Sequence, residues 1–192
     1  MKKIISLFKR DYEGTRLVYD EIVEGAEWVI AGEGTATEKI DGTSCLLRYN
    51  DGQVELLKRY DAKSGKTPPI NFVPAQDPDP VTGHYPGWIP VHADNKADMW
   101  YLEGLDNYLA NNKTYEYGTF ELIGEKVQKN PYGLVGHTLV KHGAKVLDDV
   151  PTDFEGLRDY LVSQNIEGIV WHHPDGRMVK IKKRDFGLEW AV

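Results

Sequence analysis

The chain has 192 residues, of which 41% are hydrophobic and 28% charged, and its formal net charge is −7 at pH 7. These values predict one soluble globular domain over residues 1–192, and the acidic balance argues against non-specific nucleic-acid binding by the bulk surface. No apolar run is long enough to cross a membrane, and a single cysteine excludes an internal disulfide, so a reducing cytoplasm is expected.

The charge is distributed unevenly along the chain. Nine acidic and two basic residues lie between Asp11 and Asp41, whereas five basic and two acidic residues lie between Trp171 and Gly187. Local basic patches of this kind suit the binding of a short nucleic-acid end, and the alternative is a dispersed, solubilising surface. A second basic cluster consists of Lys58, Arg59, Lys63 and Lys66.

The first informative segment is Lys39-Ile40-Asp41-Gly42. A strand through Lys39 and Asp41 would place both side chains on one face, and Gly42 would permit a tight turn beside a phosphate or base. A neutral lysine amine can attack the α-phosphate of a nucleotide and expel pyrophosphate, which leaves a phosphoramidate. The segment therefore predicts the nucleophile of a covalent nucleotidyltransferase. The alternative is a strand that ends in an Asp-Gly turn with a solvated lysine.

The middle of the chain is predicted to contain strands, a proline-rich loop and a helix. Residues 56–60 and 115–124 are the strands. Seven of the ten prolines lie between Ser64 and Pro90, and we expect an ordered loop there because its aromatic side chains have apolar surface to bury. Residues 94–112 are expected to form a helix with one apolar face.

The last part of the chain is predicted to form a second helix and a β-hairpin. The helix spans residues 152–164, with Thr152 and Glu155 as its capping box. Apolar residues alternate on both sides of a Pro-Asp-Gly turn at residues 174–176, which indicates a hairpin. On its second strand Lys180 and Lys182 share one face, where two neighbouring ammonium groups favour an anion such as a triphosphate. The alternative is an edge strand whose lysines lie in water.

Taken in order, these motifs resemble the ATP-dependent RNA ligase branch of the covalent nucleotidyltransferase superfamily. The chain is most similar to the small 5′–3′ RNA ligases that include the vertebrate cytosolic RNA ligase and phage and bacterial relatives. The resemblance extends from Glu27 to Lys182 and includes residues 83–90 and 119–133, which the wider superfamily lacks. It implies an α+β, antiparallel-sheet adenylation domain, as the short strands and two helices also predict. Only ten residues follow Lys182, so no C-terminal OB-fold is expected.

The resemblance implies a role for each matching position. Lys39 would be the adenylylated nucleophile, while Lys180 and Lys182 would hold the α-phosphate and the departing pyrophosphate. Glu167 would bind Mg²⁺, directly or through water, and Asp41 would hold the nucleotide or a hydrated metal ion. The remaining nucleotide-binding positions would be Glu38, Gly42, Arg59 at the sugar or a phosphate, and Glu121 at the ribose 2′-hydroxyl. The residue that stacks on adenine is left open among Trp88, Phe120 and Tyr132.

The implied activity is ATP-dependent RNA ligation in RNA repair. AMP held by Lys39 would pass to an RNA 5′-phosphate, which would then be sealed to a 3′-hydroxyl. ATP and Mg²⁺ would be required, with Mn²⁺ as a substitute, in the cytoplasm or in the host cytoplasm of a phage. A partner chain could orient the RNA. Two alternatives stay open: a stand-alone adenylyltransferase that modifies a protein or small molecule without sealing strands, and a non-catalytic nucleotide- or RNA-binding module.

Cys45 and a pair of histidines are not assigned to the predicted site. Cys45 is predicted to be a small buried hydrophobe. His172 and His173 are adjacent on a strand and face opposite sides, so they are not expected to share a zinc ion.

Overall fold

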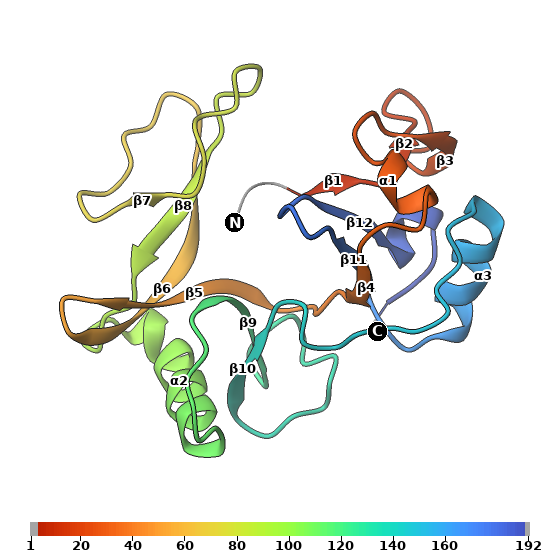
Figure 1. The fold of residues 1–192 in the computed structure, drawn as a ribbon. Coiled ribbons are helices and arrows are strands. Elements are labelled where there is room, and N and C mark those ends of the chain that lie inside the picture. Colours follow the sequence, from red (N-terminus) through yellow and green to blue (C-terminus); the bar gives the residue numbers. More distant parts are fainter. Residues whose placement is uncertain (1–3, 191–192) are drawn as a thin grey trace. The chain divides into compact units, whose positions relative to one another are not determined.

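The computed structural model describes residues 4–190, which divide into two compact units. One unit comprises Asp41–Lys141, and the other comprises Ile4–Ile40 together with residues 142–190. Figure 1 labels the helices and strands of both. The chain crosses between the units after Ile40 and after Lys141. A single domain over residues 1–192 stays a prediction.

The unit Asp41–Lys141 is built on a six-stranded sheet in which all neighbouring strands are antiparallel. The strand order is β10-β9-β5-β6-β8-β7. Asp51 and Gly52 connect β5 to β6, and both have positive φ angles, as a two-residue hairpin turn requires. The strands are β5 (Thr43–Asn50), β6 (Gln53–Ala62), β7 (Val73–Pro74), β8 (Tyr85–Pro90), β9 (Gly118–Gly124) and β10 (His137–Lys141).

A long helix packs against this sheet. The helix α2 (Met99–Asn111) follows a 3₁₀ turn, η1 (Lys96–Asp98), so the predicted helix at residues 94–112 is confirmed. Its buried Tyr108 packs in a core with Phe120 and Leu122. Cys45 lies in the same core with no exposed surface, and burial raises the pKa of its thiol, so it is the buried hydrophobe that was predicted.

The proline-rich segment is more regular than predicted. Residues 85–90 form strand β8, and Trp88 within it is buried. The loop prediction was wrong there because prolines are tolerated where no ladder hydrogen bond is needed. The edge strand β7 pairs only with Gly87 and Trp88, so Pro86 and Pro90 of β8 lie outside that ladder.

The other unit contains a four-stranded sheet with the order β1-β12-β11-β4. Strands β11 and β12 form the predicted hairpin, and the edge-strand alternative for β12 is contradicted because β1 and β11 flank it. The pair β1–β12 is parallel, while β4, β11 and β12 run antiparallel. These strands are β1 (Ile5–Ser6), β4 (Thr35–Glu38), β11 (Gly168–His172) and β12 (Met178–Lys182).

Two helices and a small hairpin complete this unit. The hairpin is β2 (Phe8–Arg10) with β3 (Val18–Ile22), and the helices are α1 (Glu27–Ile30) and α3 (Phe154–Ser163). The predicted capping residue of α3 was wrong by one position, because the Asp153 side chain accepts the hydrogen bond from the Gly156 N–H. Both units are therefore mixtures of antiparallel strands and few helices, as predicted. Within residues 4–190, no helix is long and apolar enough to cross a membrane.

Candidate nucleotide site

Three segments align at one end of the four-stranded sheet. Lys39 directly follows β4, and its backbone N–H donates to the Gly168 carbonyl at 2.9 Å. On its other side Gly168 pairs with Lys182 of β12. Strand register therefore places Lys39, Gly168 and Lys182 in one row, although 128 residues or more separate Lys39 from the other two segments.

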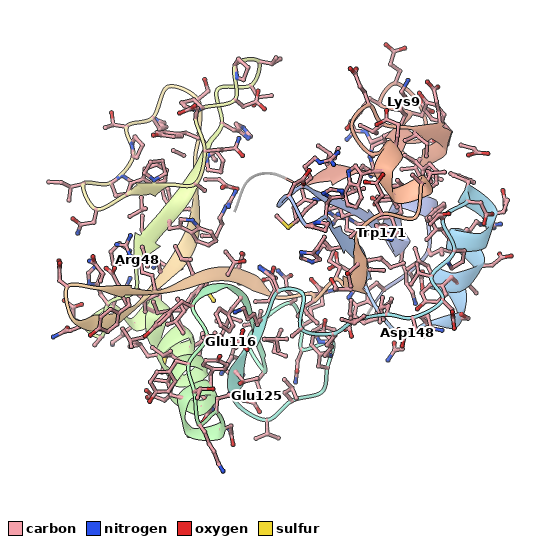
Figure 2. The ribbon with its side chains drawn as sticks, viewed as in Figure 1. Lys9, Arg48, Glu116, Glu125, Asp148 and Trp171 are labelled. Carbon is pink, nitrogen blue, oxygen red and sulfur yellow. The ribbon has the colours of Figure 1, made fainter. Side chains whose placement is uncertain are left out.

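The basic side chains occupy the sheet face opposite the core. Val179 and Ile181 of β12 are fully buried in the core, as are Ile169 and Trp171 of β11, the latter labelled in Figure 2. Because side chains alternate along a strand, Lys180 and Lys182 project from the other face, as predicted. Lys39 lies in the row of Gly168 and Lys182, on the same side of the sheet, and the pKa of Lys180 is lowered by burial and then by the positive charge of Lys39.

Lys39 is held by an acidic partner. Its Nζ lies 2.5 Å from Oε2 of Glu167, the residue immediately before β11. The Lys39 side chain is 22% exposed and that of Glu167 is 11% exposed, so the amine is sheltered but accessible. Carboxylate oxygens are ligands that Mg²⁺ prefers, and the Glu167 carboxylate fits that role beside the amine.

The other two cations lack such a partner. Among residues 4–190, neither the Lys180 nor the Lys182 amine has a hydrogen bond or an ion pair. Burial lowers the pKa of both side chains, to about 8 for Lys182, which is 7% exposed. A buried cation without a counter-ion is costly. This face of the sheet is therefore suited to an anion with several charges.

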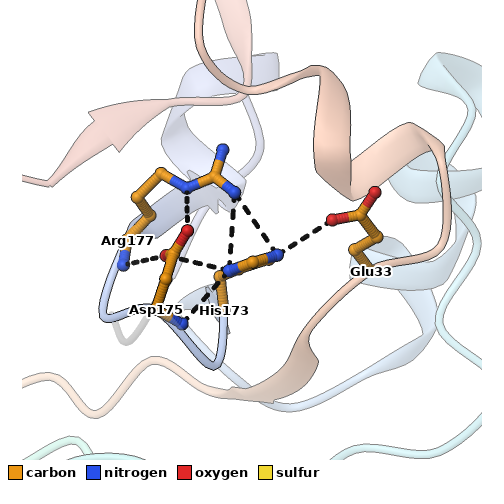
Figure 3. A network of polar contacts seen from close by, with 4 residues as sticks. All are labelled: Glu33, His173, Asp175 and Arg177. Carbon is orange, nitrogen blue, oxygen red and sulfur yellow. Dashed lines mark hydrogen bonds and ion pairs between the residues drawn. The ribbon is translucent and has the colours of Figure 1, made fainter.

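The far end of the hairpin is fixed by a polar network. His173 Nε2 lies 2.8 Å from Glu33 and its Nδ1 lies 2.8 Å from Asp175. His172 instead has its Nε2 3.0 Å from the Thr37 hydroxyl, and its pKa is lowered by burial and by His142. The two histidines thus have separate partners. Figure 3 shows the network, which consists of Glu33, His173, Asp175 and Arg177.

The prediction of a strand through Lys39 and Asp41 was wrong. Residues 39–42 lie between β4 and β5 and belong to neither strand. A Cβ on Gly42 would lie 2.4 Å from the Leu122 carbonyl oxygen, so glycine is needed for this close backbone approach.

A loop whose conformation was not predicted, although its Tyr132 was a candidate for stacking on adenine, holds the backbone at Asp41 and Gly42. The Tyr132 hydroxyl accepts a hydrogen bond from the Asp41 N–H at 2.8 Å, and Gln128 Nε2 donates to the Gly42 carbonyl at 3.1 Å. Gln128, Lys129 and Asn130 have φ angles of 48°, 60° and 56°, a left-handed run without glycine. Such backbone strain is concentrated at functional sites. Asn130-Pro131 was the one turn signal that could have indicated this loop.

The other predicted nucleotide residues have the following places. Glu38 forms an ion pair with Lys145 at 3.2 Å. Arg59 on β6 pairs with Asp61 at 2.7 Å, and its guanidinium carbon lies 5.3 Å from the centre of the Trp88 ring. Glu121 is a partly buried residue of β9, opposite Ser44 of β5.

The three candidates for stacking on adenine differ in exposure. Phe120 has no exposed surface and Trp88 is 2% exposed, so neither offers a ring face. Tyr132 is partly exposed and is the one of the three with accessible surface.

The chain is similar in sequence to characterised proteins. The profile of the family described as RNA ligase 1 matches residues 105–192. The protein named RNA ligase 1 from Rattus norvegicus is 29% identical in an alignment 234 residues long. That alignment covers 82% of this chain and 68% of the rat protein. The RNA ligase 1 of Danio rerio is 29% identical in an alignment 252 residues long, which covers 96% of this chain and 77% of the fish protein. The RNA ligase 1 of Mus musculus is 28% identical in an alignment 234 residues long, which covers 82% of this chain and 68% of the mouse protein.

Proposed function

Because this chain is a relative of the RNA ligase 1 proteins, we propose that it is an ATP-dependent RNA ligase that carries AMP on Lys39. One observation supports this assignment most strongly. Lys39 lies at the sheet face from which Lys180 and Lys182 project, and among residues 4–190 neither the partly buried Lys180 nor the buried Lys182 forms an ion pair. The phosphates of ATP would supply the missing negative charge.

In the first step the Lys39 amine attacks the α-phosphate of ATP. A nitrogen–phosphorus bond forms, the bond to pyrophosphate breaks, and the proton that the amine loses passes to solvent. Lys180 and Lys182 stabilise the negative charge on the phosphates, and Glu167 orients the amine through its 2.5 Å contact. The domain type that this mechanism implies is the covalent nucleotidyltransferase adenylation domain.

A magnesium ion, when bound, would neutralise phosphate charge. Glu167 is proposed to hold it directly or through water, with Mn²⁺ as a substitute, since carboxylate and water oxygens suit both ions. Asp41 is the second proposed metal residue.

The remaining nucleotide contacts are proposed from the resemblance. Glu121 would accept from the ribose 2′-hydroxyl, and Arg59 would contact the sugar or a phosphate. Tyr132 is proposed to stack on adenine because it has accessible ring surface. Glu38 and Gly42 are the other two proposed nucleotide-binding residues.

AMP would then pass to the 5′-phosphate of an RNA end, and a 3′-hydroxyl would attack that end and release AMP. We propose that this reaction repairs cleaved RNA in the cytoplasm. The RNA 5′-phosphate is an anion like the phosphates of ATP, so we propose that the transfer of AMP to it uses the same cationic face.

The test is incubation with α-labelled ATP and Mg²⁺, followed by a nicked or hairpin RNA with 5′-phosphate and 3′-hydroxyl ends. Label that binds the protein and then appears in a longer RNA supports the proposal. Stable label without sealing would replace it by the stand-alone adenylyltransferase. No label with ATP or GTP would overturn both. Lys39→Arg keeps the positive charge but cannot become a neutral nucleophile, so it should take no label.

A further inference from the structure

We propose that Arg10 and Asp185 are positioning residues that act through Lys182 in the adenylylation step. This inference rests on the proposed function, since it concerns how Lys182 meets the phosphates of ATP. Arg10 lies in the N-terminal hairpin and Asp185 in the short 3₁₀ helix η2 (Lys183–Phe186) that follows β12.

The Asp185 carboxylate connects two parts of the unit. Its Oδ2 accepts a hydrogen bond from the backbone N–H of Lys182 at 2.9 Å, and its Oδ1 accepts one from the Arg10 guanidinium. Asp185 is 2% exposed, so both bonds are shielded from water. The carboxylate therefore fixes the residue at which β12 ends.

Arg10 in turn is fixed by the hairpin. A second guanidinium nitrogen donates to the Arg16 carbonyl in the turn between β2 and β3. Close by, the Phe8 ring lies 5.0 Å from Phe154 and 6.3 Å from Phe186, so an aromatic cluster joins the hairpin to α3 and η2. Arg10 thus holds Asp185 from a well-packed support.

This arrangement affects the Lys182 amine in two ways. The negative charge of Asp185 offsets part of the cost of burying the cation. At the same time Arg10 occupies one carboxylate oxygen and the Lys182 backbone occupies the other, so Asp185 does not form an ion pair with the Lys182 amine. The amine is kept charged and is left for a substrate anion.

The end of β12 is also tied to the partner of the nucleophile. The Lys183 N–H donates to the Glu167 carbonyl at 2.9 Å, directly beside the residue that Asp185 holds. A shift of this strand end would therefore move Lys182 relative to Glu167. Charge-assisted hydrogen bonds of the Arg10–Asp185 kind are strong enough to fix such a position.

The test uses Arg10→Met and Asp185→Asn in the full chain, with Lys9→Met as the matched control. Lys9 is the neighbouring cation, pairs with Glu21 on the exposed side of the hairpin and is labelled in Figure 2. The rate of enzyme–AMP formation is measured against ATP concentration. Arg10→Met and Asp185→Asn should each raise the KM for ATP about tenfold. Arg10→Lys should restore part of this loss, and Lys9→Met should leave the KM for ATP unchanged.

The decisive comparison is with Lys182→Ala. If Arg10 acts through Lys182, adding Arg10→Met to Lys182→Ala should cause no further loss, because the interaction is already removed. Losses that multiply would overturn the proposal. So would a lower melting temperature for Arg10→Met with an unchanged KM for ATP, which indicates a purely structural pair.

A separate reaction keeps the test independent of folding and of the proposed function. Sealing of a pre-adenylylated RNA requires no departure of pyrophosphate, so Arg10→Met should retain it within about twofold of wild type if the protein is folded. Loss of sealing together with loss of adenylylation would overturn the specific role. If the wild-type chain forms no enzyme–AMP at all, the proposed function fails rather than this inference.

Discussion

The Lys39 ammonium lies 2.5 Å from the Glu167 carboxylate, although 128 residues separate them in the chain. β4 leads into Lys39 and β11 begins directly after Glu167, so the pairing of these strands brings the two together. Glu167 therefore orients the amine at rest, and the amine must lose its extra proton before it attacks, because only the neutral form is nucleophilic. Among residues 4–190, Lys180 and Lys182 on the same face form no ion pair with a carboxylate, which distinguishes them from the proposed nucleophile.

Glu167→Gln should slow formation of enzyme–AMP about 100-fold, because it removes the charge that orients Lys39 and would hold the metal. The amide has nearly the same shape, so the melting temperature should change little. Glu155→Gln is the matched control, since Glu155 is exposed on α3 and pairs with the exposed Arg158 at 3.6 Å. Equal adenylylation by both variants would contradict the role of Glu167.

The KM for ATP should rise as the pH increases through about 8. Burial lowers the pKa of Lys182 to about 8, so its amine loses the positive charge that binds phosphate in this range. Arginine remains charged at every pH used, so Lys182→Arg should remove this alkaline rise. An identical pH dependence in both proteins would show that another group titrates.

Lys182→Met should stabilise the folded chain while it slows adenylylation. The pKa of Lys182 is about 8 in the folded state and 10.5 in its ordinary state, so the unfolded chain binds more protons between these values. The free energy of unfolding contributed by this group therefore rises with pH across that window. Below pH 8 its burial costs a few kcal/mol at most, roughly 1.4 kcal/mol per pKa unit. Urea unfolding at pH 7 measures the gain, and Lys66→Met at an exposed site should give none.

The sequence predicted the parts of the fold that depend on periodicity. Alternation on both sides of residues 174–176 predicted the β11–β12 hairpin and the shared face of Lys180 and Lys182. The apolar face of α2 was equally readable, since Trp100 and Tyr108 pack in one core. The contact between Lys39 and Glu167 was not predicted, because the resemblance implied a role for each residue and periodicity does not indicate the distance between them.

Features that depend on local backbone geometry were not predictable. Residues 39–42 alternate like a strand, yet they belong to no strand, and Gly42 approaches the Leu122 carbonyl too closely for a side chain. Gln128 and Lys129 have left-handed conformations that favour glycine, so their residue types gave no signal of this loop. Asp153 rather than Thr152 caps α3, a one-residue choice between two good capping side chains.

Tyr132→Phe should weaken the hold on the loop at Asp41 without removing the ring. The hydroxyl accepts from the Asp41 N–H, so its loss should slow adenylylation several-fold, in line with about 1 kcal/mol for one hydrogen bond. Tyr132→Ala should additionally raise the KM for ATP if the ring stacks on adenine, by about tenfold or more. Tyr115→Phe, at a half-exposed tyrosine, is the control. A Tyr132→Ala protein with unchanged KM would exclude this ring as the adenine platform.

Gly168→Ala should impair both stability and adenylylation, because Gly168 lies between Lys39 and Lys182 in the strand register. A Cβ there would lie 2.2 Å from the Ile181 carbonyl oxygen and 2.8 Å from the Lys182 Cα, both of them backbone atoms that cannot rotate away. Overpacking of this kind costs about 1–3 kcal/mol. It should push β11 and β12 apart at the end of the sheet where Lys39 and Lys182 lie. Urea unfolding and enzyme–AMP formation per folded molecule measure the two effects, and Val162→Ala on the exposed side of α3 is the control. A stable Gly168→Ala protein with normal adenylylation would contradict the view that this row of backbone pairs sets the distance between nucleophile and cation.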